Sequence, residues 1–457
     1  MNGIKYRSAD EMKDSGIEWI GEIPRDWHVL MIKRLSTISR GASPRPIDDP
    51  RFFDDFGEYG WTRISDVTAS SGFLDTTEQR MSKIGANLSV KLQPNSLFLS
   101  IAGSVGKPCI NKIKVCIHDG FVYFPMLDDS LIKFMYYLFE GAQCYLGLGK
   151  LGTQLNLNRE TVGSIHIPFT PQFCNQRKIA NFLDIKIAQF DSIIAKKELL
   201  ISKLEEAKKS LISEVVTGKV KIVDGQMIWR QPEEMKDSGF EWLGMIPKSW
   251  KVIKLKFIGE SIIGLTYSPD DIVNVPGTLV LRSSNIQNGK LDFHDTVYVN
   301  KSISKDLSLR KGDILICSRN GSRDLIGKNA VIDSDAAGST FGAFMTIYRT
   351  IYWKFIYYIF NSTLFEYQSS SFLSSTINQL TSGNLNNFVV AFPMSSDERN
   401  SISSFLDIER VKFDETVEYT KSQITLLKSA KQSLISEAVT GKIDLRDWEI
   451  IEQGGVS

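Results

Sequence analysis

Two glycine-rich sequences that end in lysine are the first candidates for chemistry. They are Gly103–Lys107 and Gly321–Lys328. A phosphate-binding loop needs the spacing G-x4-G-K-[ST], because main-chain N–H groups hold the phosphates while the Ser or Thr hydroxyl binds Mg²⁺. Neither sequence has this spacing, and neither has Ser or Thr after its lysine. We therefore predict no nucleotide site and no cofactor.

The residues that could form a metal or catalytic site are scattered. The five cysteines contain no C-x-x-C pair, and the four histidines are far apart. Zinc ligands come in closely spaced pairs, so no metal site is predicted. Free thiols fit a reducing compartment, which favours a cytoplasmic location. No Ser/His/Asp or Cys/His set stands out, and there is no Pro-Pro dipeptide of the kind that amino-methyltransferases use. The chain is predicted not to be an enzyme.

Composition and charge give no global sign of a nucleic-acid-binding, secreted or membrane protein. The chain has 457 residues, 42% of them hydrophobic, and a net charge of +1. Such a neutral balance is no global signal for nucleic acid, so any claim of DNA binding must rest on local features. The N-terminal residues are charged without the apolar core of a signal peptide, and no apolar run approaches the length of a membrane span. An acidic cluster at 48–58 is typical of a solvated loop.

Two long stretches organise the chain, and each is predicted to be one helix. The first spans 171–219 and the second 394–442, with Asp184 and Asp407 223 residues apart. About 45 helical residues extend roughly 65 Å. Apolar residues recur in each at alternating spacings of four and three, which is typical of a helix packed on another helix. Thr170 and Ser395 are the expected N-caps, Ser395 within a capping box with Glu398, and Gly218 and Gly441 are the expected stops.

The same offset of 223 residues continues beyond the helices. The sequence at 11–19 is repeated almost unchanged at 234–242, and Ile-Pro-x-x-Trp at 23–27 is repeated at 246–250. The chain is therefore a tandem repeat of segment, head and helix. The predicted divisions are an N-terminal segment (1–24), a first head (25–170), a first spacer helix (171–219), a connector (220–247), a second head (248–393), a second spacer helix (394–442) and a tail (443–457).

Each head is predicted to be a small α+β domain that is rich in strands. Short apolar runs alternate with Gly, Pro, Asn and Asp, and one aromatic helix follows late in each head, at 131–143 and at 352–368. A short connector favours antiparallel helices, which would place the heads at opposite ends of the pair. We predict an α+β fold with two strand-rich heads separated by two long antiparallel helices, as a pseudo-two-fold tandem repeat.

This organisation resembles the specificity subunit of type I restriction–modification enzymes. The resemblance covers nearly the whole chain. It rests on the two Ile-Pro-x-x-Trp sequences, on Ser-Leu-Ile-Ser-Glu-x-Val-Thr-Gly-Lys at 210–219 and 433–442, and on the 318–328 sequence of the second head. One departure is that Asn175-Gln176 and Glu398-Arg399 stand where the family often has Glu-Gln.

The resemblance implies that each head reads a few base pairs of double-stranded DNA. The helices would space the two half-sites and dock two methyltransferase subunits, and through them the restriction subunits. Those subunits would hold S-adenosylmethionine and ATP, and this chain would hold neither.

The polar loops of the heads supply the expected DNA contacts. Arg can bond guanine with two hydrogen bonds, and Asn or Gln can do so with adenine. The expected contact residues are Arg45, Arg63, Lys107, Gln154 and Asn156 in the first head, and Arg282, Asn285, Arg319, Asn320, Arg323, Lys328 and Gln379 in the second.

Two other interpretations remain open from the sequence. The chain could be a coiled-coil scaffold whose heads bind protein or carbohydrate, or part of a restriction enzyme whose catalytic domain lies elsewhere. Binding of duplex DNA by the heads separates the scaffold from the specificity subunit, and a methyltransferase-like neighbouring gene argues against the enzyme fragment.

Overall fold

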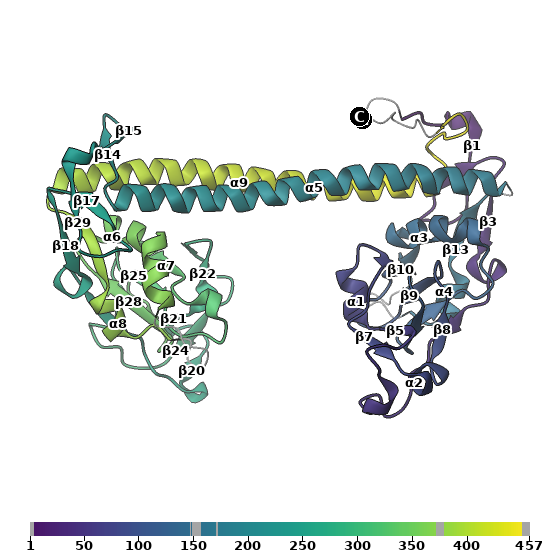
Figure 1. Cartoon of the computed structure of the whole chain (residues 1–457), viewed down its shortest axis with the longest axis horizontal. Helices are drawn as coiled ribbons and strands as arrows, with labels where there is room; N and C mark the ends of the chain where they lie inside the picture. The colour runs from purple at the N-terminus through teal and green to yellow at the C-terminus, as the bar shows by residue number, and fades with distance from the viewer. Residues whose placement is uncertain (1–3, 147, 149–156, 171, 372–378, 450–457) are drawn as a thin grey trace. The chain divides into compact units, whose positions relative to one another are not determined.

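A computed structural model describes residues 4–146, 148, 157–170, 172–371 and 379–449 of the chain (Figure 1). The chain divides into two compact units. The first contains residues 1–197 and 422–457, and the second contains residues 198–421. Each unit therefore combines one head with a part of each long helix.

The two long helices have equivalent bounds. They are α5 (Phe173–Val216) and α9 (Ser396–Val439), each of 44 residues. In the first unit Asp191 of α5 pairs with Lys431 of α9 at 2.6 Å, and Lys197 donates to Gln423. Residue numbers thus rise along one helix as they fall along the other, which confirms the predicted antiparallel pairing.

Burial along these helices follows the predicted apolar repeat. Leu183 and Ile187 are buried in the core of the first unit, and Leu406 is buried in that of the second. Thr420 is buried too, but its hydroxyl donates to the carbonyl of Thr416 one turn earlier. The polar interruptions of the seam are therefore tolerated because the helix or the opposite helix bonds them.

Both long helices end at the predicted glycines. Gly218 and Gly441 each have φ of +73°, in the left-handed region that favours glycine. A Cβ on Gly441 would lie 2.8 Å from Cγ of Pro24 and 2.9 Å from Cη2 of Trp27. Each glycine therefore lets the Ile-Pro-x-x-Trp sequence of its unit pack against the helix end.

Gly441→Ala should destabilise the first unit for two reasons. The left-handed backbone costs a residue with a Cβ about 1–2 kcal/mol, and the new methyl group would also meet Pro24 and Trp27. Gly16→Ala is the matched control, because its φ is +72° and no atom lies within 4 Å of its built Cβ. We expect a larger drop in urea-unfolding midpoint for Gly441→Ala, and equal drops would contradict the packing role.

The first head is built on two sheets. One has the order β4 (Ser39–Arg40), β12 (Phe121–Tyr123), β9 (Leu97–Ser100), β10 (Pro108–Asn111) and β6 (Phe73–Leu74), and the other β7 (Gln79–Met81), β5 (Tyr59–Thr62), β11 (Val115–Ile117) and β8 (Val90–Leu92). Its helices are α1 (Ile64–Ala69), α2 (Lys83–Asn87), α3 (Ile132–Glu140) and α4 (Arg159–Ser164). In the same unit β1 (Met12–Asp14) pairs with β2 (Glu22–Pro24), and β3 (His28–Met31) pairs with β13 (His166–Phe169).

The second head has a corresponding pair of sheets. One has the order β19 (Glu260–Ile263), β28 (Met345–Arg349), β25 (Ile314–Cys317) and β26 (Asn329–Val331), and the other β20 (Ile272–Val273), β24 (Val297–Val299), β21 (Thr278–Leu281) and β27 (Thr340–Phe341). The remaining pairs of the unit are β14 (Val220–Val223) with β15 (Gln226–Trp229), β16 (Met235–Asp237) with β17 (Met245–Pro247), β18 (Trp250–Lys254) with β29 (Val389–Pro393) and β22 (Ile286–Gln287) with β23 (Lys290–Leu291). Its helices are α6 (Trp353–Phe360), α7 (Thr363–Ser370) and α8 (Ser382–Asn387).

The single aromatic helix predicted at 352–368 is wrong in one respect, because it is two helices. α6 ends at Phe360 and α7 begins at Thr363. The Asn361 amide donates to the carbonyl of Tyr357 and to Asn329 of β26. This side chain therefore ends α6 by bonding its last turn, a local competition that apolar periodicity does not reveal.

The heads share main-chain bonds although their sequences differ. In the first head Ser100 N–H donates to Lys107 O and Gly106 N–H to Ser100 O. The corresponding donors in the second head are Cys317 N–H, to Lys328 O, and Gly327 N–H, to Cys317 O. The β9–β10 loop and the β25–β26 loop are thus equivalent, and they carry the two Gly-Lys sequences.

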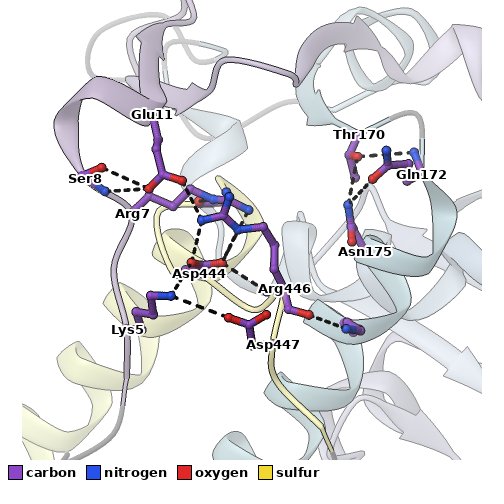
Figure 2. Close-up of polar contacts among 12 residues, drawn as sticks. Lys5, Arg7, Ser8, Glu11, Thr170, Gln172, Asn175, Asp444, Arg446 and Asp447 are labelled. Atoms are coloured by element: carbon purple, nitrogen blue, oxygen red, sulfur yellow. Dashed lines mark hydrogen bonds and ion pairs between the residues drawn. The ribbon is translucent and has the colours of Figure 1, made fainter.

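The first unit joins the beginning and the end of the chain. Arg7 N–H donates to Lys442 O at 3.0 Å, as Arg230 N–H does to Lys219 O in the connector of the second unit. Around this joint the buried Asp444 carboxylate accepts from Arg446 and pairs with Lys5, and Arg446 also reaches Glu11 (Figure 2). The hydrogen bonds from Arg446, together with the charges of Arg446 and Arg7, lower the pKa of Asp444, so the carboxylate stays charged.

Asn175 stands where the family often has Glu, and this difference has a structural consequence. In the second unit Glu398 accepts from Nε1 of Trp250 at 3.0 Å and from Arg230. Asn175, its equivalent in the first unit, bonds Thr170 and Gln172 instead (Figure 2). Nε1 of Trp27 is buried and has no hydrogen-bond partner among the described residues.

Glu398→Ala should lower the free energy of unfolding by about 1–3 kcal/mol, the usual cost of leaving a buried donor unpaired. Asn175→Glu should raise it, because the longer carboxylate can accept from Trp27. Glu418→Ala is the control, since its ion pair with Lys421 is exposed and should contribute under about 1 kcal/mol. Thermal unfolding of the full chain measures all three, and a destabilising Asn175→Glu would refute the assignment.

Candidate nucleic-acid interface

Three loops and the helix α1 of the first head meet at one edge of its sheets. The residues after β4 pair with the β11–β12 turn, through Ala42 N–H to Ile117 O. That turn bonds the β9–β10 loop, through Ile101 N–H to Gly120 O. The loop in turn contacts α1, where the hydroxyls of Thr68 and Ser104 are 3.0 Å apart. We call this edge, formed by residues 40–46, 63–70, 101–107 and 117–120, the first loop edge.

The structure brings three predicted residues of the first head to this edge. Arg45 is 77% exposed in its side chain and pairs with Asp119 at 3.2 Å. Arg63 precedes α1, where its guanidinium bonds Gln79 and lies 3.7 Å from Glu78. Lys107 turns inward, and its ammonium donates to the carbonyl of Thr68 at 2.9 Å. The two arginines can reach a ligand from these positions, whereas Lys107 braces the loop.

The remaining predictions for the first head cannot be placed. Gln154 and Asn156 lie outside the described residues. The sequence reasoning also missed Arg40, whose guanidinium donates to Asp119 O, and His118, which lies beside the same aspartate. Burial lowers the pKa of His118 against the opposing effect of Asp119, so the ring is uncharged at neutral pH.

The second head has an equivalent edge. Leu265 N–H donates to Phe341 O and Ser318 N–H donates to Phe344 O, which repeat the bonds that join the turns of the first head. Leu380 N–H donates to Ser318 O at 2.7 Å, which adds the residues before α8. We call this edge, formed by residues 263–267, 282–285, 318–328, 342–344 and 379–381, the second loop edge.

Apart from Asn285, the six predicted residues of the second head lie on this edge, and two of them approach Ser283. Arg282 pairs with Asp295 at 2.7 Å, Asn320 Nδ2 lies 3.4 Å from Ser283 Oγ, and Lys328 Nζ lies 3.5 Å from Ser283 O. Arg319 and Gln379 form an isolated antiparallel bridge. Arg323 also belongs to the β25–β26 loop, in a short 3-10 helix, and it is exposed.

Asn285 does not serve as a base-reading residue in this arrangement. Its side chain is fully buried. Its amide accepts from Arg282 N–H and donates to the carbonyls of Asp292 and Asp295. These bonds satisfy it and fix the turn that carries Arg282, as Asp66 does for Arg63 in the first head. In this position the Asn285 side chain holds the turn and is not open to a ligand.

The two Gly-Lys sequences connect antiparallel strands, whereas a phosphate-binding loop connects a strand to a helix. Among the described residues, no group of three or more His, Cys, Asp or Glu side chains is placed to hold a metal ion. In the part of the chain that the structure describes, no helix is both long and apolar enough to cross a membrane.

Comparisons with known proteins define the class. The family model for the type I restriction modification DNA specificity domain matches twice, at residues 24–205 and 247–429. These matches cover most of the chain, so the chain belongs to this family. The repeat of the match agrees with the two loop edges built on the same main-chain bonds.

Several relatives carry specificity-subunit names. The type I restriction enzyme EcoKI specificity subunit of Escherichia coli (strain K12) is 28% identical over 211 residues, and the StySPI specificity subunit of Salmonella potsdam is 29% identical over 215 residues. Each of these matches covers 44% of this chain and 44% of the relative, so it spans under half of either length. The MjaVIII specificity subunit of Methanocaldococcus jannaschii is 23% identical over 93% of this chain and 95% of the relative.

A solved structure of the type I R-M system contains a chain with the same fold. The TM-score is 0.64 at 13% identity, over 92% of this chain and 99% of that chain. At 13% identity the similarity shows a shared fold, and it carries no information on which residues bind a ligand.

Proposed function

We propose that this chain is the DNA-recognition subunit of a type I restriction–modification complex and that it reads an asymmetric target in two parts. The observation that carries the proposal is the family match in both halves, together with two loop edges of shared backbone and different side chains. Because the edges differ, each head would read a different half-site. The shared backbone would present both sets of side chains in the same way.

Recognition would use the arginines of the loop edges. Arg45 and Arg63 in the first head and Arg319 in the second are exposed, and Arg282 of the second head is half-buried beside Asp295. Their planar guanidinium groups match O6 and N7 of guanine. The chain would contribute no catalytic group. Methyl transfer and cleavage would belong to two methyltransferase subunits and the restriction subunits, within the cytoplasm.

Methylation mapping tests this function directly. The full chain would be expressed with its candidate methyltransferase subunit in a host without other methylation, and the modified adenines would be sequenced. The expected result is one split, asymmetric motif. A soluble complex that leaves no motif would favour the scaffold interpretation.

Arg63→Ala and Arg282→Ala should each relax one half of that motif and leave the other half unchanged. Losing a bidentate contact to a base costs about 1–3 kcal/mol of discrimination, which corresponds to about 5–150-fold. Each variant is the control for the other, because the substitution is the same and only the head differs. Relaxation of both halves by one variant would contradict the assignment of one half-site to each head.

Apolar residues on the outer faces of the long helices support partner docking. Ile408 and Tyr419 of α9 are 58% and 65% exposed, and each comes two residues after a buried seam residue, Leu406 or Val417. Ile185, the equivalent of Ile408 on α5, is 38% exposed. The methyltransferase subunits would cover these side chains, since an apolar helix face can dock against a partner.

Ile185→Glu and Ile408→Glu should weaken assembly with the methyltransferase subunit, because a charge replaces an apolar contact. Gln189→Glu, at an exposed position of α5, adds the same charge without removing an apolar group. Co-purification at matched expression measures assembly. The docking proposal fails if the control weakens assembly as much as the two isoleucine variants do.

A further inference from the structure

The second loop edge carries an exposed aromatic ring that the fold does not use. Phe344 lies in the turn between β27 and β28 and is 59% exposed. Its carbonyl accepts from Ser318 N–H at 3.1 Å, Arg319 N–H at 3.0 Å and Ser318 Oγ at 3.0 Å. Three donors thus fix the backbone of Phe344 while its ring faces solvent. Exposing an apolar ring to water gives no stability. What distinguishes Phe344 from other exposed rings is its place within the second loop edge, beside Arg319.

The guanidinium of Arg319 lies over this ring. Its central carbon is 5.2 Å from the ring centroid. Stacking uses the flat face of a guanidinium and leaves its N–H groups pointing outward in the plane, where they can bond two acceptors at once. The contact with the ring therefore restrains Arg319 at this edge, and bidentate recognition of guanine would use the N–H groups of its fork.

The surroundings of this pair are polar. Asn320 and Lys328 both approach Ser283 at this edge. Gln379 bridges the backbone of Arg319. An apolar ring among hydrogen-bonding side chains matches the chemistry of the major groove, where the methyl group of thymine lies beside donors and acceptors of neighbouring base edges.

At the equivalent position, which the structure describes, the first head has no counterpart to the ring. Ile101 N–H donates to Gly120 O as Ser318 N–H donates to Phe344 O, so Gly120 occupies the equivalent position. A Cβ there would lie 2.4 Å from Cε1 of His118. The first loop edge therefore excludes a side chain at the position where the second presents an aromatic one, and this difference should separate the sequences that the two heads read.

We infer that Phe344 and Arg319 together read two neighbouring base pairs in the half-site of the second head. The ring of Phe344 contacts the C5-methyl group of a thymine. Arg319, restrained by that ring, donates to O6 and N7 of a guanine on the adjacent base pair. This inference rests on the proposed function, and it requires the half-site to contain a thymine next to a guanine.

Base analogues that remove single groups test the pair. The full chain, in complex with its methyltransferase subunit, would be titrated with duplexes that carry the mapped motif. Uracil would replace each thymine of this half-site in turn, which removes only the methyl group. One uracil should weaken binding by the native chain about fourfold, the value of one buried methyl group. Phe344→Ala should bind the thymine and uracil duplexes equally.

Arg319 has its own probe. 7-Deazaguanine removes N7 from guanine and should weaken binding by the native chain at the position next to the sensitive thymine. Arg319→Ala removes every side-chain donor at this position, so it should bind the guanine and 7-deazaguanine duplexes equally.

Phe257→Ala is the matched control. Phe257 is 72% exposed in the same head and has the Lys256 ammonium 5.2 Å from its ring, but it lies in the 3-10 helix Leu255–Phe257 outside the second loop edge. It should keep the full sensitivity to uracil. The inference is overturned if no uracil weakens the native complex, if Phe344→Ala stays as sensitive as the native chain, or if the mapped half-site lacks an adjacent thymine and guanine. The proposed function fails separately, by the absence of any mapped motif.

Discussion

An amphipathic helix of 44 residues is stable in water only when its apolar stripe is covered, and both units are built around that requirement. In each unit the stripe packs against the opposite long helix and against the aromatic helix of the head, α3 or α6. A repeated polar contact fixes this packing. Tyr137 donates to Asp184 at 2.7 Å in the first unit, and Tyr358 donates to Asp407 in the second. Covering the long helices thus also fixes where each head attaches.

The parts of the structure that depend on neighbouring residues could be predicted from the sequence. Gly218 and Gly441 end the helices because the left-handed conformation at a helix end depends on the residue at that position alone. The apolar seam of each long helix likewise follows from the spacing of residues along that one helix. The loop edges could not be predicted, because pairing between distant strands brings Arg282, Asn320 and Gln379 together. Asn285 has the right chemistry for a base contact, yet three main-chain groups use its amide, and nothing in its sequence neighbourhood reveals this. Phe344 is not predicted as a contact residue either, because the prediction considers only side chains that form hydrogen bonds.

Three arginines of the loop edges have a carboxylate beside them. Asp119 lies by Arg45, Glu78 by Arg63 and Asp295 by Arg282. These acids orient the guanidinium groups before any ligand binds, and they compete with phosphates that could attract the same groups without regard to sequence. A base edge with two aligned acceptors can displace these carboxylates more readily than a single phosphate oxygen can. The reason is that two acceptors match the paired N–H donors of a guanidinium group. A net charge of +1 and sequence-dependent binding are therefore compatible in this chain.

The equivalent loops of the two heads differ in length but not in the bonds that close them. Residues 101–105 lie between the closing groups of Ser100 and Gly106, and residues 318–326 lie between those of Cys317 and Gly327. Lengthening such a loop from about five to about nine residues costs only about 0.5 kcal/mol of closure entropy. Insertions and deletions at this place are nearly neutral for folding. A few mutational steps at this loop can therefore change the surface that one head presents, while the scaffold that joins it to the rest of the chain remains unaltered.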